Sequence, residues 1–374
     1  MREGIDSRNE ELDFDVVFLL STLMLLVVGT VMVYSASFFV SKENFGGGTA
    51  LTLRRMWHLL IGVAAMLGIM HIDYRKLLNR TLVYSLLAAG IVSLVLCFVP
   101  GFGMTAGHAR RWVHLFFFNY QASELIKIAL ILYMASFLAR KAKDIGDFST
   151  GVLPILLVAG ISALLILIEP DFGTAAIIGS WAVITLFVAG MRWKHLGMLL
   201  AAGIPAAAVI MVIEPYRKAR LTAFMNPWED MQGTGYQIIQ SLVAFSKGGL
   251  FGTGLGEGSQ KLFYLPAPHT DFIFSVLGEE IGFLGVAGVI ALFGIWTWRG
   301  LAIAKGTNDA FGFYLAVCSV TLVTLQAVIN MGVALSLFPT TGIALPFFSC
   351  GGTTLITTMI ASGLVLSVSR GARL

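Results

Sequence analysis

The sequence predicts an all-α, polytopic integral membrane protein with about ten transmembrane helices. Of its 374 residues, 57% are hydrophobic and only 12% are charged, whereas a soluble domain carries about 25% charged residues. The charges are also unevenly spread, because 16–41 and 310–369 contain no Asp, Glu, Lys or Arg. A bilayer core needs about 20 apolar residues per helix. Since lipid cannot satisfy open backbone groups, these stretches are expected to be helical.

Ten apolar stretches have the length of membrane spans, and residues 1–374 are treated as one transmembrane domain with tails at 1–14 and 369–374. The uncharged run at 310–369 is too long for one span, and a Pro- and Gly-containing break at 338–342 divides it. A second break lies at 169–171, although the flanking pair also fits one long kinked helix. The expected spans are 15–39, 56–72, 81–99, 122–139, 151–168, 173–190, 195–213, 271–297, 310–337 and 343–368.

The distribution of Lys and Arg predicts the orientation of these spans. With the N-terminus in the cytoplasm, the inside segments carry 14 Lys and Arg residues and the short outside loops carry 5. An excess of positive charge marks the cytoplasmic side, and long loops are exempt from this rule. Both termini are therefore expected in the cytoplasm. The large loop at 214–270, before the eighth span, is expected on the extracytoplasmic side.

Composition and motifs disfavour several other classes of protein. The net charge of +4 comes from short clusters beside spans, so it does not indicate nucleic-acid binding. Cys97, Cys318 and Cys350 lie in or beside apolar spans and are expected to be packing residues without disulfides. The N-terminus lacks the pattern of a cleavable signal peptide. The glycines at 248–258 match neither a phosphate-binding loop nor a dinucleotide fingerprint, so we expect a close-packed turn and no nucleotide.

Two acidic sites lie inside predicted spans, where ionisable groups are costly unless they face a cavity or a partner. Glu124 and Lys127 are three residues apart and therefore share one helical face. They are candidates for a catalytic pair, and the alternative is a structural pair that locks two helices. Glu279 and Glu280 lie about two turns into their span. Adjacent positions point in different directions, so one is expected to line a cavity and the other to pair elsewhere.

Two further acidic sites lie where spans begin or end. Glu169 and Asp171 flank Pro170 at an outward-facing break, where they suit a cation or a basic residue. Capping of the next helix is an equal alternative for Asp171. Asp271 follows His269 at the point where the large outer loop enters the membrane. A carboxylate there can act as a general base towards a hydroxyl group, and an N-cap is again the alternative.

Basic residues on the outer side add a candidate site for anions. Arg110 and Arg111 lie in a short outer loop, against the charge bias of the rest of the chain. The planar guanidinium is suited to binding phosphate, whereas the alternative is an interfacial anchor beside Trp112. The six histidines show no zinc-ligand spacing, so no metal-binding residue is assigned.

Several ordered stretches together resemble the SEDS family of bacterial shape, elongation, division and sporulation proteins. The resemblance covers nearly the whole chain and is closer to the division branch than to the elongation branch. Some positions depart from the family pattern, namely Ala122, Thr341, Ala344, Cys350 and Thr353-Thr354, and none of them replaces an acidic residue. The stretches are 33–37, 109–112, 121–127, 169–174, 260–273, 278–280 and 345–352.

The resemblance implies a peptidoglycan glycosyltransferase of the bacterial cytoplasmic membrane. It implies lipid II as substrate, a class B penicillin-binding protein and other division proteins as partners at the septum, and a divalent cation such as Mg²⁺ or Mn²⁺. Asp271 corresponds to the essential acid of the family, and Glu124 and Lys127 to the acid and base of its fourth span. Lys261 and His269 belong to the motif before Asp271 and are expected, with Arg110 and Arg111, to bind substrate. Glu169, Asp171, Glu279 and Glu280 are expected to be structural or cation-binding.

Two other functions fit the composition. A lipid II flippase would also have many spans and buried charges, but it needs polar groups that reach both faces of the membrane. The unusual charges of this chain are expected near the outer face, which favours the enzyme. A non-catalytic scaffold for division proteins is the third interpretation.

Overall fold

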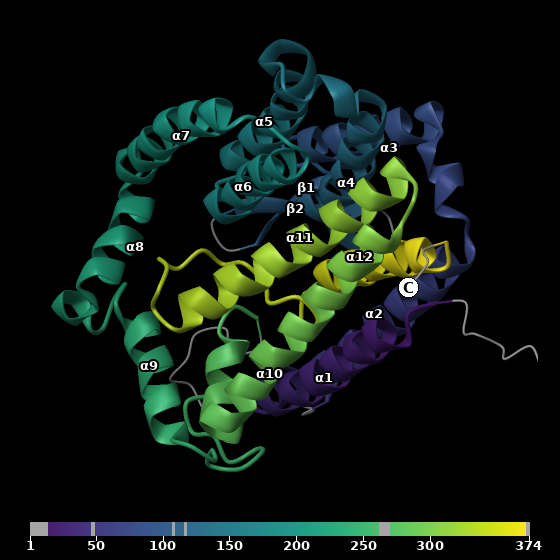
Figure 1. Cartoon of the computed structure of the whole chain (residues 1–374). Coiled ribbons are helices and arrows are strands. Elements are labelled where there is room, and N and C mark those ends of the chain that lie inside the picture. Colours follow the sequence, from purple (N-terminus) through teal and green to yellow (C-terminus); the bar gives the residue numbers. More distant parts are fainter. Residues whose placement is uncertain (1–13, 46–48, 107–108, 116–117, 262–269, 372–374) are drawn as a thin grey trace, which may run out of the picture.

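The computed structural model describes residues 14–45, 49–106, 109–115, 118–261 and 270–371, and within them the chain is predominantly helical (Figure 1). Ten of the described helices follow the order of the expected spans. These are α1 (Val16–Phe45), α2 (Ala50–His71), α3 (Arg80–Leu96), α4 (Ala122–Lys141), α5 (Leu153–Ile168), α6 (Phe172–Val188), α7 (Trp193–Ile213), α10 (Ile273–Gly306), α11 (Ala310–Ala334) and α12 (Gly352–Ser369).

The helical membrane class is confirmed. Within the described ranges, eight helices are long and apolar enough to cross a bilayer, and α3 and α6 are shorter apolar helices of 17 residues each. The number of spans therefore stays a prediction. The outer loop contributes two more helices, and short helical turns lie in several connections. These are α8 (Pro215–Met225), α9 (Tyr236–Gly248), η1 (Tyr74–Leu78), η2 (Ala142–Asp144), the π-helical η3 (Phe148–Val152) and η4 (Pro227–Asp230).

The core lies between α4, α11 and α12, whose side chains are mostly buried. Indole groups tie neighbouring helices to it: Trp181 Nε1 on α6 donates to the carbonyl of Cys318 on α11 at 3.0 Å. Trp296 Nε1 on α10 donates to Thr22 Oγ1 on α1 at 2.9 Å. By contrast, none of the side chains of α7 is buried, and α7, α8 and α9 form an arc along one side of the molecule (Figure 1). This arc places the outer loop beside the ends of α6 and α11.

The start of the last span was predicted wrongly. The expected span began at 343, but α12 begins at Gly352, and the preceding chain is buried and non-helical. Pro346 and a positive φ of 65° at Phe347 interrupt any helix there. Arg55 of α2, almost fully buried, donates to the carbonyls of Phe347 at 2.5 Å and Phe348 at 3.1 Å, and also to that of Ser349. Non-helical backbone at membrane depth is tolerated where protein satisfies it in this way.

A small antiparallel sheet in the connection from α3 to α4 was not predicted. Its strands are β1 (Gly103–Ala106), β2 (Ala109–Leu115) and β3 (Phe118–Gln121), in the order β1-β2-β3. Trp112 pairs with Gln121 and Val113 with Tyr120, and the Val113 side chain is fully buried. Arg110 and Arg111 lie on strand β2 of this sheet, whereas the sequence suggested only a short loop.

The glycine-rich segment at 248–258 closes a break in α10. Gly282, with φ +71°, interrupts that helix. The amides of Thr253 and Gly254 donate to the carbonyls of Glu279 and Glu280 at 2.9 and 3.1 Å, and the amide of Phe283 donates to the carbonyl of Gly249 at 2.9 Å. Backbone groups that the break leaves open are thus paired by the loop. The prediction of a close-packed turn is confirmed.

Candidate functional site

A cavity of about 530 Å³ lies where four connections meet: the β-sheet, the α5–α6 turn, the beginning of α8 and the α11–α12 segment. The predicted topology puts all four on the same side of the membrane. Three guanidinium groups line the cavity, those of Arg111, Arg217 and Arg220, and the described lining contains one acidic residue, Glu214. Residues from distant parts of the sequence therefore form one positively charged chamber with an apolar wall of α5 and α6 residues.

Arg111 joins the sheet to the α5–α6 turn. Its Nη2 donates to the carbonyl of Pro170 at 3.0 Å, and its Nε lies 3.5 Å from Asp171 Oδ2. Asp171 also caps α6, because its carboxylate accepts from the amide of Thr174 at 3.1 Å and from its hydroxyl at 3.0 Å. The two sequence interpretations of Asp171, helix cap and partner of a basic residue, are therefore both present.

Arg217 and Arg220 of α8 complete the basic lining, and the sequence analysis missed both. The guanidinium of Arg220 lies over the ring of Tyr216 at 4.5 Å, and its Nη1 donates to the carbonyl of Thr340 at 3.0 Å. Arg217 lies 6.0 Å from the ring centre of Phe172. Both lie in the long loop at 214–270, which is exempt from the rule that positive charge marks the cytoplasmic side. Their spacing of three residues on a helix was the available signal.

Asp271 lies beside this chamber, at the beginning of α10. Gly342, in the segment that supplies Thr340 and Thr341 to the lining, comes close enough that a Cβ on it would lie 3.7 Å from Asp271 Oδ2. Burial raises the pKa of Asp271, and the charges of Arg220 and Arg111 oppose that shift. A partly buried carboxylate with a raised pKa, next to a positively charged chamber, has properties that suit a general base.

Glu169 lies behind the same wall, almost fully buried. Burial raises the pKa of Glu169 to about 8, and the nearby Asp171 acts in the same direction, while Cys97 and Arg111 lower it. In the cation-free chain the raised pKa therefore favours the neutral acid at pH 7.

Glu124 and Lys127 form a separate buried cluster between α4 and α12. Lys127 Nζ donates to Glu124 Oε1 at 2.7 Å, and Thr354 Oγ1 donates to the same oxygen at 2.9 Å. The predicted pairing on one helical face is present. Neither residue lines the arginine chamber, and the contact with Thr354 ties two helices together, as the structural alternative requires.

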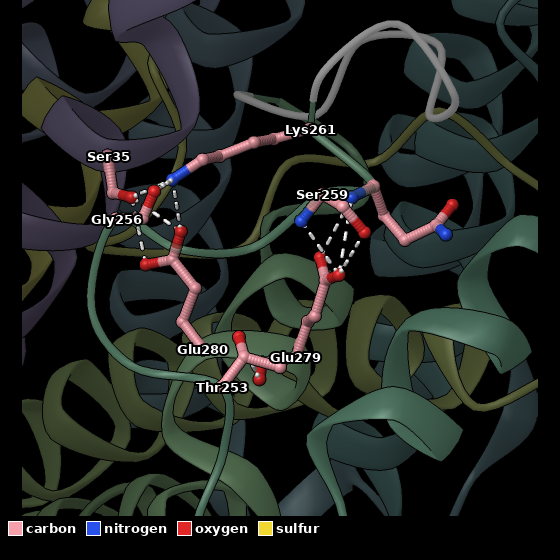
Figure 2. A network of polar contacts seen from close by, with 8 residues as sticks. Ser35, Thr253, Gly256, Ser259, Lys261, Glu279 and Glu280 are labelled. Atoms are coloured by element: carbon pink, nitrogen blue, oxygen red, sulfur yellow. Dashed lines mark hydrogen bonds and ion pairs between the residues drawn. The ribbon is translucent and has the colours of Figure 1, made fainter.

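Lys261, Glu279 and Glu280 anchor the outer loop to α10 (Figure 2). Lys261 Nζ donates to Glu280 Oε1 at 2.6 Å, to Ser35 Oγ at 2.9 Å and to the carbonyl of Gly256 at 2.7 Å. Glu279 accepts from the backbone amides of Ser259 and Gln260. The two acids point to different partners, as expected from adjacent positions. Every hydrogen-bond donor of the Lys261 ammonium is engaged in this anchor.

The remaining predicted site residues lie elsewhere. Arg110 is exposed and does not line the chamber, unlike its neighbour Arg111. His269 falls in the range 262–269, outside the described residues. Within the part of the chain that the structure covers, no group of three or more His, Cys, Asp or Glu side chains is arranged to hold a metal ion.

Apolar helices with an arginine-lined chamber at one end define a polytopic membrane protein. The chain belongs to the FtsW/RodA/SpoVE family of cell cycle proteins, whose family model matches residues 16–374. The resemblance to the SEDS proteins is thereby confirmed.

Individual relatives cover nearly the full length of the chain. It is 41% identical to stage V sporulation protein E of Bacillus subtilis, over 96% of this chain and 98% of that protein. It is 43% identical to a probable peptidoglycan glycosyltransferase FtsW of Geobacter metallireducens, over 95% of this chain and 94% of that protein.

Solved structures share the fold. One described as the structural coordination of polymerization and crosslinking by a peptidoglycan synthase complex aligns with a TM-score of 0.77 and 27% identity, over 96% of this chain and 98% of that chain. The rod shape determining protein RodA of Thermus thermophilus aligns with a TM-score of 0.70 and 27% identity, over 97% and 99%.

Proposed function

We propose that this chain is a peptidoglycan glycosyltransferase that polymerises lipid II, with Asp271 as general base. The observation that carries the proposal is the position of the Asp271 carboxylate beside a chamber lined by Arg111, Arg217 and Arg220. Relatives at about this chain's full length bear the name peptidoglycan glycosyltransferase. A lipid-linked sugar diphosphate is the kind of anionic, membrane-bound substrate that such a chamber fits.

In the proposed reaction, the 4-hydroxyl of the N-acetylglucosamine of one lipid II lies next to Asp271. Its oxygen attacks the anomeric carbon of the growing lipid-linked chain, and its proton passes to the carboxylate. The bond from the anomeric carbon to the phosphate oxygen breaks, and the lipid diphosphate leaves. An α-linked donor that gives a β-linked product is inverted once, so no covalent enzyme intermediate forms. The leaving group comes with the donor, so no nucleotide is required.

The three arginines stabilise the departing diphosphate. Guanidinium groups form strong, charge-assisted hydrogen bonds with phosphate oxygens, and a fixed positive environment favours the charge that develops as the bond breaks. Glu124 and Lys127, apart from the chamber, support the bundle that carries it, through Thr354. This differs from the catalytic role expected from the resemblance.

A divalent cation remains part of the proposal. Mg²⁺ is usually held by one or two protein carboxylates together with substrate phosphates. Asp171, a cation-binding candidate of the sequence that lies beside the chamber next to Arg111, would fit that pattern. A cation there would add Lewis-acid stabilisation of the diphosphate.

We also propose the bacterial cytoplasmic membrane as the location, with both termini inside and the chamber outside. Septal cell-wall synthesis agrees with the FtsW relatives. A class B penicillin-binding protein and other division proteins are the proposed partners. The similar solved structure concerns a complex that coordinates polymerization and crosslinking.

The decisive test uses the purified full-length protein with a class B penicillin-binding protein and lipid II in detergent, and detects glycan strands. Wild type is expected to polymerise, and Asp271→Ala to lose about 10²-fold or more of the rate. Glu229→Ala, an exposed acid in the same outer loop, is the matched control and is expected to behave as wild type. A parallel arm with a chelator tests the cation. Full activity of Asp271→Ala contradicts the general-base role. Transfer of lipid II across sealed vesicles without any polymer supports the flippase instead.

A further inference from the structure

One buried amide on α11 connects Asp271 to the segment that borders the chamber. Asn330 is 1% exposed, and its Nδ2 donates to the carbonyl of Asp271 at 3.0 Å and to the carbonyl of Ile343 at 2.6 Å. The first carbonyl belongs to the beginning of α10 and the second to the α11–α12 connection. Both N–H groups of a single amide are thus used to bring two separate segments together.

The segment at 340–343 is fixed from other sides as well. Its Thr340 carbonyl accepts from Arg220 on α8 at 3.0 Å. Its Thr341 carbonyl packs so closely on α6 that a Cβ at Gly173 would lie 2.9 Å from it. Gly342 has a φ of +74°, a conformation that favours glycine, and a Cβ on it would lie in van der Waals contact with the Asp271 carboxylate, 3.7 Å from Oδ2. Among these contacts of the 340–343 segment, the one made by Asn330 also includes a hydrogen bond to the backbone of Asp271.

The chemistry of the contact requires an amide nitrogen. Two carbonyl oxygens converge on Asn330, and carbonyls accept but do not donate hydrogen bonds. A leucine of the same size would leave both carbonyls without this donor, and an aspartate would place negative charge against them. A buried carbonyl without a hydrogen-bond donor is unfavourable, so loss of the amide favours movement of the short segment that carries the carbonyl.

We propose that Asn330 is a positioning residue for the glycosyl transfer, holding Asp271 at the distance from the 340–343 segment and the arginine chamber that the reaction needs. This inference rests on the proposed function, because it assigns the position of its general base. Asn330 touches the backbone of Asp271 and takes no proton. Its loss therefore acts on the chemical step through the position of Asp271, while all three arginines of the chamber are retained in the chain.

The pKa of the Asp271 carboxyl distinguishes a positioning role of Asn330 from a purely structural one, because lost stability alone would not change this pKa. The charged groups that face it are Arg220 of α8, Arg111 of β2 and Asp171 at the beginning of α6, and burial raises its pKa above the ordinary value. Release from Asn330 lets water reach the carboxyl and lowers that pKa. The acid limb of the pH–rate profile then moves to lower pH.

The test compares wild type, Asn330→Ala, Asn330→Ser and Ser319→Ala as purified full-length proteins with lipid II. Ser319 is buried on the same helix, and its hydroxyl donates to the carbonyl of Leu315 within that helix. Ser319→Ala therefore controls for the removal of a buried polar group from α11. We expect kcat of Asn330→Ala to fall about 10- to 100-fold, with KM within about twofold. Asn330→Ser, which keeps one donor, is expected to lie between Asn330→Ala and wild type, and it carries the test if Asn330→Ala does not fold.

The outcomes separate this inference from the proposed function. Folded Asn330 variants with kcat and acid limb equal to those of Ser319→Ala overturn the positioning role, even if Asp271→Ala is inactive. A lower kcat with an unmoved acid limb overturns it too, because the loss then reflects stability alone. An active Asp271→Ala overturns the general base and the positioning role together. Thermal unfolding of each variant in the same detergent reports folding.

Discussion

Arg111 Nε lies 3.5 Å from Asp171 Oδ2, which joins a strand of the small sheet to the start of α6. Arg110, its neighbour in the sequence, is exposed and lies outside the chamber lining. The two arginines were equivalent candidates in the sequence. In the structure only Arg111 faces the proposed diphosphate site.

Single substitutions of these two arginines are therefore expected to differ. Arg111→Ala removes a chamber guanidinium and leaves Asp171 without its basic partner, so we expect polymerisation of lipid II to fall about tenfold or more. Arg110→Ala is the matched control, with a rate within about twofold of wild type. Equal losses in both variants would show that the chamber does not distinguish them. Initial rates of glycan-strand formation give the comparison.

The arginines of α8 are expected to act on substrate binding. Arg217→Ala and Arg220→Ala each remove a charge-assisted contact to phosphate, so KM for lipid II is expected to rise about tenfold. Lys218→Ala, an exposed cation between them, should leave KM unchanged. Added salt should weaken binding in wild type more than in the Arg variants, because salt screens charges. A Lys218 effect as large as the Arg effects would point to general attraction by the loop.

The pH dependence of the wild-type rate follows from Asp271. A general base works only when deprotonated, so the rate is expected to fall as pH drops through the pKa of this carboxyl. Because burial raises that pKa, the acid limb should lie above the ordinary range of aspartate. The pH–rate profile at saturating lipid II measures it. An acid limb at or below the ordinary value of 3.8 would contradict this environment.

Glu169 gives a pH dependence of stability rather than of rate. Its pKa is about 8 in the folded chain against an ordinary 4.5, so protonation stabilises the fold. This contribution is complete below pH 4.5 and is lost as pH rises to about 8, by at most about 1.4 kcal/mol per pH unit. Between these values, the Tm of wild type should fall more steeply with pH than the Tm of Glu169→Gln. Parallel curves would show that Glu169 is ionised in the folded chain.

The buried pair of Lys261 and Glu280 is expected to matter far more than an exposed pair. Glu280→Gln leaves the Lys261 ammonium buried without a counter-charge, which costs about 3–5 kcal/mol. The pair of Lys141 and Asp144 is similar in distance, 2.8 Å, but exposed, so Asp144→Asn should cost at most about 1 kcal/mol. Thermal unfolding in detergent measures both. A small effect of Glu280→Gln would mean that the loop anchor of Figure 2 is held by its backbone contacts.

The sequence was sufficient for local features. Charge-free runs predicted the helices, because lipid leaves the backbone no partner but itself. The break at Pro170 followed from its residue types. The pairing of Glu124 with Lys127 and the different partners of Glu279 and Glu280 followed from helical periodicity, which is a property of neighbouring residues. The glycine-rich turn was also read correctly.

Other features depended on contacts between distant segments. The late start of α12 depends on Arg55, which lies almost 300 positions earlier and satisfies the carbonyls of Phe347 and Phe348. Arg217 and Arg220 became candidates only when α8 was seen beside the 340–341 segment.

By itself, the sequence determined that this chain is a helical membrane protein of the SEDS type. It also determined which acidic residues lie at the ends of its helices. Only the tertiary structure decided which cations lie near Asp271, which of two adjacent arginines lines the chamber, and that Asn330 bonds to the backbone of Asp271. The physical reason is the distance along the sequence over which each effect acts. Hydropathy and helical period act over a few residues, whereas a chamber is assembled from connections whose packing no local pattern encodes.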